Sequence, residues 1–267
     1  MSSKHIAELF SQLPFDEARH AQVSAIDEPS PRYLIAMTPR SGSSHLCDVL
    51  KNTGRLGRPG EMLSREFIPN IVKSAPGRDA DDYLATVMRV IRTPNGVSGL
   101  KASWFQFDHF RGAMRDPSVF DKFKVIYLTR RNLAAQAVSL YCATASNVFH
   151  TNVQHSPDER GRLAALGYDF AQIRQWHRHI EAQERGWQRY FIEHRLQPLC
   201  ITYEDIEDDV VAVVQRIAQY IGRPRASETA SSDSIFRKIG NRRNVEWTAQ
   251  FMLDLDAEQR AEPPPSP

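Results

Sequence analysis

The sequence lacks the features that mark several broad classes of protein. Its 267 residues include only three cysteines, Cys47, Cys142 and Cys200, which are far apart and lie among apolar residues. An odd number of dispersed cysteines provides neither a disulfide framework nor the ligand spacing of a zinc site. We therefore expect three buried free thiols and a reducing compartment.

Long apolar runs and an excess of charge of one sign are missing as well. No run approaches the roughly 18 residues that a membrane-spanning helix needs, and the N-terminus has no apolar core of a secretory signal. The 34 basic residues are nearly balanced by 32 acidic ones, and 41% of the residues are hydrophobic, as in ordinary globular proteins. We expect a cytoplasmic protein with no nucleic-acid partner and no transmembrane segment.

The two ends of the chain differ from its middle. Residues 1–30 are polar, with one amphipathic helix expected around Ile6–Leu13, and the tail is rich in proline, which removes backbone donors and fixes φ. We predict an N-terminal extension over residues 1–30, one domain over residues 31–258 and a disordered tail over residues 259–267.

Short apolar runs alternate with helical patterns between these ends. Four runs are typical of strands: Tyr33–Met37, Gly96–Lys101, Lys124–Thr129 and Leu199–Tyr203. Apolar residues at helical spacing occupy the segments Ser43–Leu50, Asp81–Ile91, Leu133–Ala143, Phe170–Phe191 and Val210–Ile221. The alternation predicts an α/β fold, with a parallel sheet flanked by helices. Ligands of such sheets bind beyond the carboxyl ends of the strands.

The turn after the first strand has the composition of an anion site. Residues Thr38–Ser44, TPRSGSS, lead into a helix, whose first N–H groups and dipole favour negative charge. Arg40 adds a donor fork suited to phosphate or sulfate. An ordinary strand–helix turn with a serine N-cap is the alternative. The chain lacks both the lysine of the nucleotide-triphosphatase loop and the dinucleotide fingerprint, which disfavours those two classes.

This strand, loop and helix resemble the 5′-phosphosulfate loop of sulfotransferases that use 3′-phosphoadenylyl sulfate (PAPS), P-[KR]-S-G-[ST]-[ST]. The resemblance implies a P-loop-like sulfotransferase fold and the transfer of a sulfuryl group from PAPS to a hydroxyl or amine. It also implies that the co-substrate is bound by Arg40, Ser41, Gly42, Ser43 and Ser44.

A second stretch, Leu128–Ser139, is similar to the 3′-phosphate motif of the same family. That motif is an arginine at a strand end and a serine eight or nine residues later. Ser139 is the serine, and Arg131 fits the shorter spacing while Arg130 fits the longer one. We favour Arg130, and the choice between the two stays open.

Two weaker similarities lie later in the chain. Tyr203-Glu204-Asp205 resembles a Y-E-D turn of the family, although a helix cap explains it equally well. The segment Arg237–Trp247, with Arg242 as a candidate co-substrate ligand, is similar to a basic segment that closes over the nucleotide. A solvated basic loop is the alternative.

Further stretches narrow the resemblance to the bacterial carbohydrate sulfotransferases, over about residues 32–255. Arg92–Trp104, Gln136–Ser139 and Gln183–Trp187 resemble the branch of mycobacterial trehalose sulfotransferase and of NodH-like or lipopolysaccharide sulfotransferases. In that branch a glutamate after the first helix is the proposed general base, and Glu61 has this place here. A sugar hydroxyl is a poor nucleophile near neutral pH, and a positioned carboxylate can take its proton.

The remaining expectations concern the reaction and its acceptor. We expect catalytic roles for Glu61, Arg40 and Lys101, although a surface lysine is the alternative for Lys101, and we expect no metal. The acceptor site implied by the resemblance consists of Pro39, Arg58, Pro59, Gly60, Glu61, Met62 and Leu63. Pro39 stands where the trehalose enzyme has glutamine, and Arg58 where it has an acidic residue.

These two departures favour an anionic sugar, such as a lipopolysaccharide unit, over trehalose. The sequence thus predicts a PAPS-dependent sulfotransferase acting on a hydroxyl of a carbohydrate or glycolipid, with a second copy of the chain as a candidate partner. The alternatives are a non-catalytic nucleotide-binding relative and a P-loop-type kinase.

Overall fold

The computed structural model describes residues 4–149, 155–235 and 242–261. It divides the chain into two compact units. The first consists of Met1–Thr129 and Gln183–Ser234, and the second of Arg130–Ala182 and Ile235–Pro267. The predicted boundary at residue 31, between the N-terminal extension and the domain, stays a prediction.

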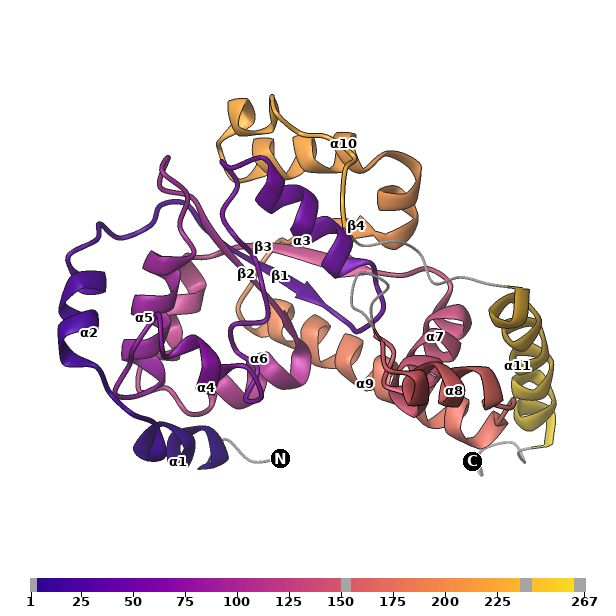
Figure 1. Cartoon of the computed structure of the whole chain (residues 1–267). Coiled ribbons are helices and arrows are strands. Elements are labelled where there is room, and N and C mark those ends of the chain that lie inside the picture. The colour runs from indigo at the N-terminus through magenta and orange to yellow at the C-terminus, as the bar shows by residue number, and fades with distance from the viewer. Residues whose placement is uncertain (1–3, 150–154, 236–241, 262–267) are drawn as a thin grey trace. The chain divides into compact units, whose positions relative to one another are not determined.

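The first unit is built on a four-stranded parallel sheet (Figure 1). Its strands lie in the order β2-β1-β3-β4, and every neighbouring pair is parallel. Their bounds are β1 Arg32–Met37, β2 Ser98–Ser103, β3 Lys124–Thr129 and β4 Leu199–Thr202. Because Met37 of β1 pairs with Ser103 of β2 and with Leu128 of β3, the carboxyl ends of these three strands meet at one edge.

The predicted α/β class and the parallel sheet are confirmed, but β1 begins one residue earlier than predicted, β2 lies two residues later at both ends, and β4 ends one residue earlier. The second strand begins at Ser98, because Gly96 takes a left-handed conformation, with φ of 87°, in the turn before it. The fourth strand ends at Thr202, and Tyr203 opens the following helix.

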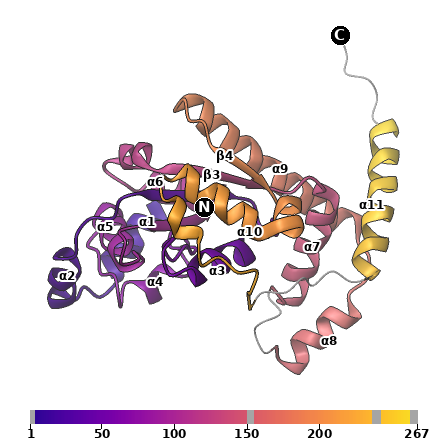
Figure 2. The same ribbon diagram turned by 90° about the horizontal axis from the view of Figure 1, so that it is seen from above.

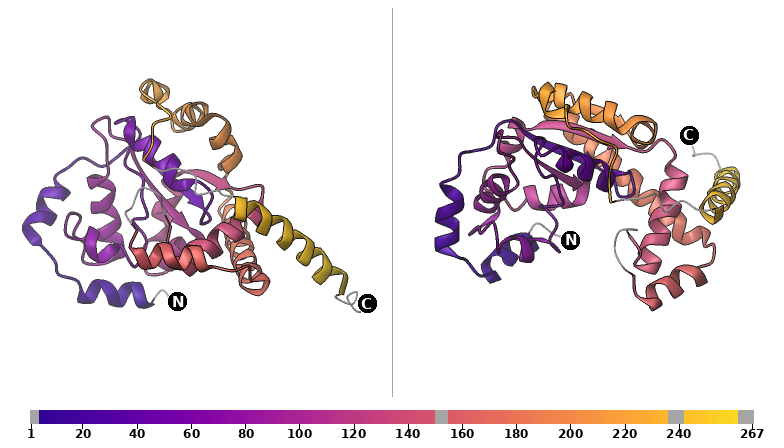
Figure 3. Two further views of the ribbon diagram at one scale, coloured as in Figure 1. Left: turned by 45° about the vertical axis from the view of Figure 1, so that its right-hand side comes forward. Right: turned by 45° about the horizontal axis from the view of Figure 1, so that its top comes forward.

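Helices cover both faces of the sheet. Along β1, Leu34 and Ala36 point into one apolar cluster, while Tyr33, Ile35 and Met37 point into the other. The first cluster is closed by α5, α6 and the Gln183–Glu193 part of α9, and the second by α3 and α10, which both views of Figure 3 show together on one side of the sheet. The bounds are α3 Ser43–Asn52, α5 Ala80–Val90, α6 Trp104–Arg111, α9 Phe170–Glu193 and α10 Tyr203–Tyr220.

The N-terminal residues form two helices, α1 (Lys4–Gln12) and α2 (Glu17–Ser24), where the sequence predicts one. The second begins because the Asp16 carboxylate accepts a hydrogen bond of 2.9 Å from the Arg19 N–H. Ile6 and Phe10 are buried in the first cluster, and the Phe10 ring lies 5.3 Å from the Tyr83 ring, centre to centre. Residues 4–24 therefore pack as part of the first unit.

Short segments complete the first unit. A one-turn helix, α4 (Ile68–Ile71), precedes α5, and two 3₁₀ turns lie at Pro117–Lys122 and Pro224–Ser227. The indole N–H of Trp187, in α9, donates to the carbonyl of Met37 over 3.0 Å. This bond fixes the last peptide of β1, directly before the loop of residues 38–44.

The second unit has an apolar core of its own. It contains α7 (Leu133–Ser146), α8 (Pro157–Ala165), the Phe170–Ala182 part of α9 and α11 (Arg242–Ala261). Residues such as Val138, Ile173 and Phe251 form the core, and α11 lies alongside α7 (Figure 2).

Two expectations fail at α11. Residues 242–247 are helical and form no loop, because Trp247, Phe251 and Leu255 recur at four-residue intervals and pack against that core. The predicted disordered tail begins too early, since residues 259–261 continue the helix. Residues 237–241 and 262–267 lie outside the described residues.

The three cysteines are free thiols, as predicted, but only Cys47 and Cys142 are buried. Cys200 is exposed because β4 is the edge strand, and its neighbour Ile201 takes the buried position in the alternation. No helix within the described ranges has the length and apolar character to cross a membrane.

Candidate functional site

The loop after β1, residues 38–44, presents the N-terminus of α3 at the carboxyl edge of the sheet. We call it the anion loop. Arg40 and Gly42 both have left-handed backbones, with φ of 67° and 81°, and Gly42 is the N-cap of α3. A Cβ atom at Gly42 would lie 2.8 Å from Cδ2 of Tyr203, so only glycine fits. The serine N-cap of the alternative interpretation is wrong, and the cap offers no side chain to the N–H groups of the first turn.

The three serines of the loop have different environments. Ser41 is fully buried, and its hydroxyl donates to the carbonyl of Thr38 over 2.7 Å, so its side chain maintains the shape of the loop. The Ser43 and Ser44 hydroxyl oxygens accept hydrogen bonds from the Lys101 ammonium, over 3.5 and 3.1 Å.

Lys101 is buried, with 6% of its surface exposed, so the alternative of a surface lysine is wrong. Its ammonium lies 3.1 Å from Oε1 of Glu61 as well as 3.1 Å from Oγ of Ser44. A buried charge is strongly unfavourable unless it is paired. The buried ammonium is therefore stable only while the Glu61 carboxylate and the anion loop both remain next to it.

Glu61 is held through its backbone neighbours and through its side chain. The carbonyl of Gly60 accepts the Lys101 N–H over 2.9 Å, and the carbonyl of Met62 accepts the Tyr83 hydroxyl over 2.8 Å. The second carboxylate oxygen, Oε2, accepts a hydrogen bond of 2.8 Å from the amide of Gln106. Burial raises the pKa of Tyr83 far above its ordinary value, so the phenol keeps its proton and remains a donor.

The turn before Glu61 packs directly on the edge strand β2. Gly57 has φ of 79°, and its N–H donates to the hydroxyl of Thr93 over 3.2 Å. A Cβ atom at Gly57 would lie 2.9 Å from the backbone nitrogen of Gly99. Of the predicted acceptor residues that follow, Arg58 is exposed and Pro59 is buried.

Two titratable groups of α3 stay neutral near pH 7. Burial raises the pKa of the Cys47 thiol to about 12, and the nearby Lys101 ammonium opposes this only in part. Burial also lowers the pKa of His45, against the opposing effect of the Asp48 carboxylate. Neither a thiolate nor an imidazolium thus contributes charge here.

The residues predicted to bind the 3′-phosphate belong to the second unit. Arg130 follows β3 directly and is half-buried, whereas Arg131 is exposed. Ser139 lies in α7, which Asn132 caps by accepting the Ala135 N–H over 2.8 Å.

Arg242 is the first residue of α11. Its side chain is 94% exposed, and its Nε lies 2.7 Å from Oε1 of Glu246. Nothing in this environment assigns it to a ligand, and its role stays a prediction.

The Tyr203-Glu204-Asp205 turn is a helix cap. Asp205 accepts the Thr202 N–H over 3.0 Å, and the Thr202 hydroxyl accepts the Asp205 N–H over 3.1 Å. The capping explanation is therefore confirmed, and the Tyr203 ring additionally fills the space beside Gly42.

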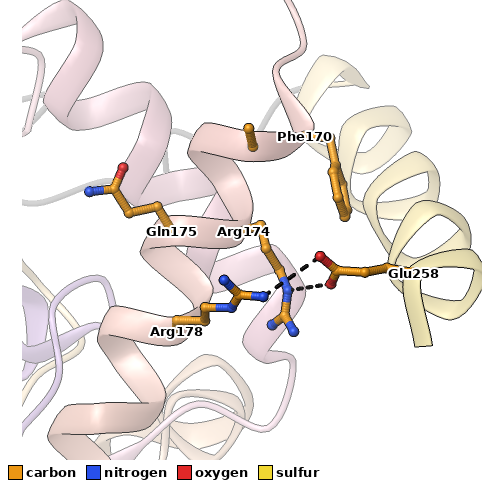
Figure 4. A pocket seen from close by; sticks show the side chains of 6 residues that line it. Phe170, Arg174, Gln175, Arg178 and Glu258 are labelled. Carbon is orange, nitrogen blue, oxygen red and sulfur yellow. Dashed lines mark hydrogen bonds and ion pairs between the residues drawn. The ribbon is translucent and has the colours of Figure 1, made fainter. Parts of the chain in front are cut away.

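A pocket in the second unit, shown in Figure 4, contains none of the predicted site residues. Both arginines of its lining are paired with Glu258, whose carboxylate oxygens lie 2.7 Å from Nε of Arg174 and 3.6 Å from Nη2 of Arg178. We therefore place the candidate site at the anion loop and Glu61. Gln106 was not among the residues predicted for this site, although the pattern Ser103-x-x-Gln106 is the signal of a capping box.

A family model and two curated relatives, all sulfotransferases, match most of the chain. A family model described as Stf0 sulphotransferase matches residues 32–254. Trehalose 2-sulfotransferase of Mycobacterium tuberculosis is 25% identical over 263 residues, covering 83% of this chain and 94% of that protein. The enzyme of the same name from Mycolicibacterium smegmatis is 24% identical over 272 residues, covering 85% and 96%. A sulfotransferase structure from Alicyclobacillus acidocaldarius has a TM-score of 0.46 and 18% identity, covering 89% of this chain and 98% of that one.

The packing of the Glu61 turn on β2 can be tested with a matched pair of glycine variants. Gly54 also has a left-handed backbone, with φ of 67°, but a Cβ there would meet nothing within 4 Å. Gly54→Ala should lower the free energy of unfolding by about 1–2 kcal/mol through backbone strain alone. Gly57→Ala should lower it further because of the backbone clash. Urea denaturation measures both, and equal losses would contradict the close approach.

Proposed function

The chain belongs to the Stf0 sulphotransferase family, and on that premise we propose that it transfers a sulfuryl group from PAPS to a hydroxyl group of a carbohydrate or glycolipid. The matched model extends over residues 32–254 and so includes both the anion loop and Glu61. The observation that carries the proposal is the Lys101 ammonium, which lies 3.1 Å from both the Glu61 carboxylate and the Ser44 hydroxyl. A group that binds an anion and a group that accepts a proton are thereby adjacent.

The anion loop fits the 5′-phosphosulfate of PAPS. Its N-cap, Gly42, has no side chain, so an anion can approach the first N–H groups of α3. Arg40 and Lys101 supply positive charge on the same loop and beside it. For the 3′-phosphate we propose Arg130 with Ser139. Arg130 is half-buried whereas Arg131 is exposed, which supports the choice of Arg130.

Glu61 acts as the general base in this proposal. It takes the proton of the acceptor hydroxyl while that oxygen forms a bond to sulfur and the bond between sulfur and the 5′-phosphate oxygen breaks. The products are the sulfate ester and 3′-phosphoadenosine 5′-phosphate (PAP). Arg40, Lys101 and the N–H groups of α3 stabilise the negative charge that develops on the departing phosphate. We expect this transfer to need no metal.

The acceptor is proposed to be an anionic sugar. Arg58 lies on the turn that carries Glu61, and its side chain is exposed. A guanidinium at this place suits a carboxylate or phosphate on the acceptor. The two mycobacterial relatives are named for trehalose, and the departures at Pro39 and Arg58 are the reason to expect a different sugar here.

Glu61→Gln tests the role of the base. The amide cannot accept the proton, so turnover should fall by about 10²- to 10⁴-fold, while the affinity for PAP stays within a few-fold. The assay follows ³⁵S from labelled PAPS into trehalose, acidic glycans and lipopolysaccharide. Glu66→Gln, an exposed glutamate five residues later, is the control and should behave like the unaltered chain. Retained turnover in Glu61→Gln would reject Glu61 as the base. If the unaltered chain bound PAP but transferred sulfate to none of these acceptors, it would be a non-catalytic relative.

Arg130→Ala tests the 3′-phosphate site. The substitution should weaken PAPS binding by at least about tenfold through the loss of a charge-assisted contact. Binding of adenosine 5′-phosphosulfate, which lacks the 3′-phosphate, should change little. Calorimetry with both ligands gives the comparison, and Arg131→Ala is the matched control. Equal weakening of both ligands, or a larger effect of Arg131→Ala on PAPS, would overturn the assignment to Arg130.

A further inference from the structure

Gln106 lies between the start of α6 and the carboxylate of Glu61. As the third residue of α6 it completes a capping box with the N-cap Ser103. The amide oxygen of Gln106 accepts the Ser103 N–H over 3.0 Å, and the Ser103 hydroxyl accepts the Gln106 N–H over 3.5 Å. The side chain is therefore fixed by the helix that it caps.

The capping bond also determines which end of the amide faces Glu61. A backbone N–H can only donate, so the amide atom opposite Ser103 must be the oxygen. The amide nitrogen then points away from Ser103, and it lies 2.8 Å from Oε2 of Glu61. A donor directed at the proposed base thus follows from the geometry of the helix start.

Glu61 consequently has a donor on each oxygen, Lys101 on Oε1 and Gln106 on Oε2. Lys101 comes from β2 and Gln106 from the first turn of α6, which follows β2 directly. They differ in what else they contact: Lys101 is shared with Ser44 of the anion loop, whereas Gln106 is tied to Ser103. A carboxylate can accept about four hydrogen bonds, so one held by two donors can still accept a proton.

We propose that Gln106 is a positioning residue, which holds the Glu61 carboxylate in the orientation needed to take the acceptor proton. The proposal rests on the proposed function of Glu61. Lys101 also interacts with the anion loop and would interact with any anion bound there. The Gln106 amide, in contrast, is held by Ser103 of the protein. Gln106 therefore keeps Oε2 in place when the charge distribution around Lys101 changes.

The identity of residue 106 separates this role from helix capping. Glutamate serves in a capping box as well as glutamine does. Gln106→Glu therefore preserves the cap of α6 but places a second carboxylate where the donor to Glu61 was. Gln106→Ala removes both the cap and the donor. A purely structural residue would tolerate the first variant better than the second.

The decisive experiment compares these variants in the full chain by turnover and by pH profile, with ³⁵S-labelled PAPS and the glycan panel. Both variants should lower kcat by about 10²-fold, the scale expected for a misplaced catalytic group, with PAP affinity within a few-fold. The acid limb of the Gln106→Glu profile should move to higher pH, because the facing carboxylate makes Glu61 easier to protonate. Glu159→Ala, which removes a capping-box side chain in α8, is the control and should leave kcat and the profile unchanged.

A titration that needs no acceptor tests the contact itself. With ¹³C-labelled glutamate, the Glu61 carboxyl signal is the one missing from Glu61→Gln, and its midpoint should rise by about one pH unit in Gln106→Glu. An unchanged midpoint would overturn the contact, and a raised midpoint with unaltered kcat would overturn the positioning role. If Glu61→Gln itself keeps its turnover, the proposed base fails, whatever the Gln106 variants do.

Discussion

The buried ammonium of Lys101 is the interaction on which the candidate site depends. It lies 3.1 Å from a carboxylate oxygen of Glu61 and 3.1 Å from the hydroxyl of Ser44, and its side chain is only 8% exposed. A charge in this position is tolerated because it is paired and hydrogen-bonded. Disturbing either partner would leave the charge poorly compensated, so Glu61 and the anion loop are held together by electrostatics as well as by backbone geometry.

The sheet supplies the framework for this interaction. β2 is an edge strand, and the turn of Glu61 covers it through the Lys101 N–H bond to Gly60 and through the close approach of Gly57 to Gly99. β1 lies next to β2 and delivers the anion loop at the same carboxyl edge. One strand–helix junction, from Lys101 to Gln106, thus orients both oxygens of the Glu61 carboxylate.

Sequence patterns predicted the framework better than the side-chain contacts. Apolar runs located β1 and β3, and their alternation with helices predicted the parallel sheet. The composition of residues 38–44 indicated an anion site, but Glu61 came only from resemblance, since a glutamate in a turn carries no local signal. Gln106 was missed because its capping pattern describes a helix start and does not show what lies opposite. The helix over residues 242–261 was missed because its apolar contacts come from distant segments.

A crystal structure of the chain soaked with PAP tests the central claim most directly. The account predicts the 5′-phosphate at the N-terminus of α3, within hydrogen-bonding distance of the backbone of the anion loop and of Nζ of Lys101. The Glu61 carboxylate should then face the open side of that phosphate and keep its bond to Gln106. A phosphate bound elsewhere, or a Glu61 side chain turned away from the anion loop, would contradict the account.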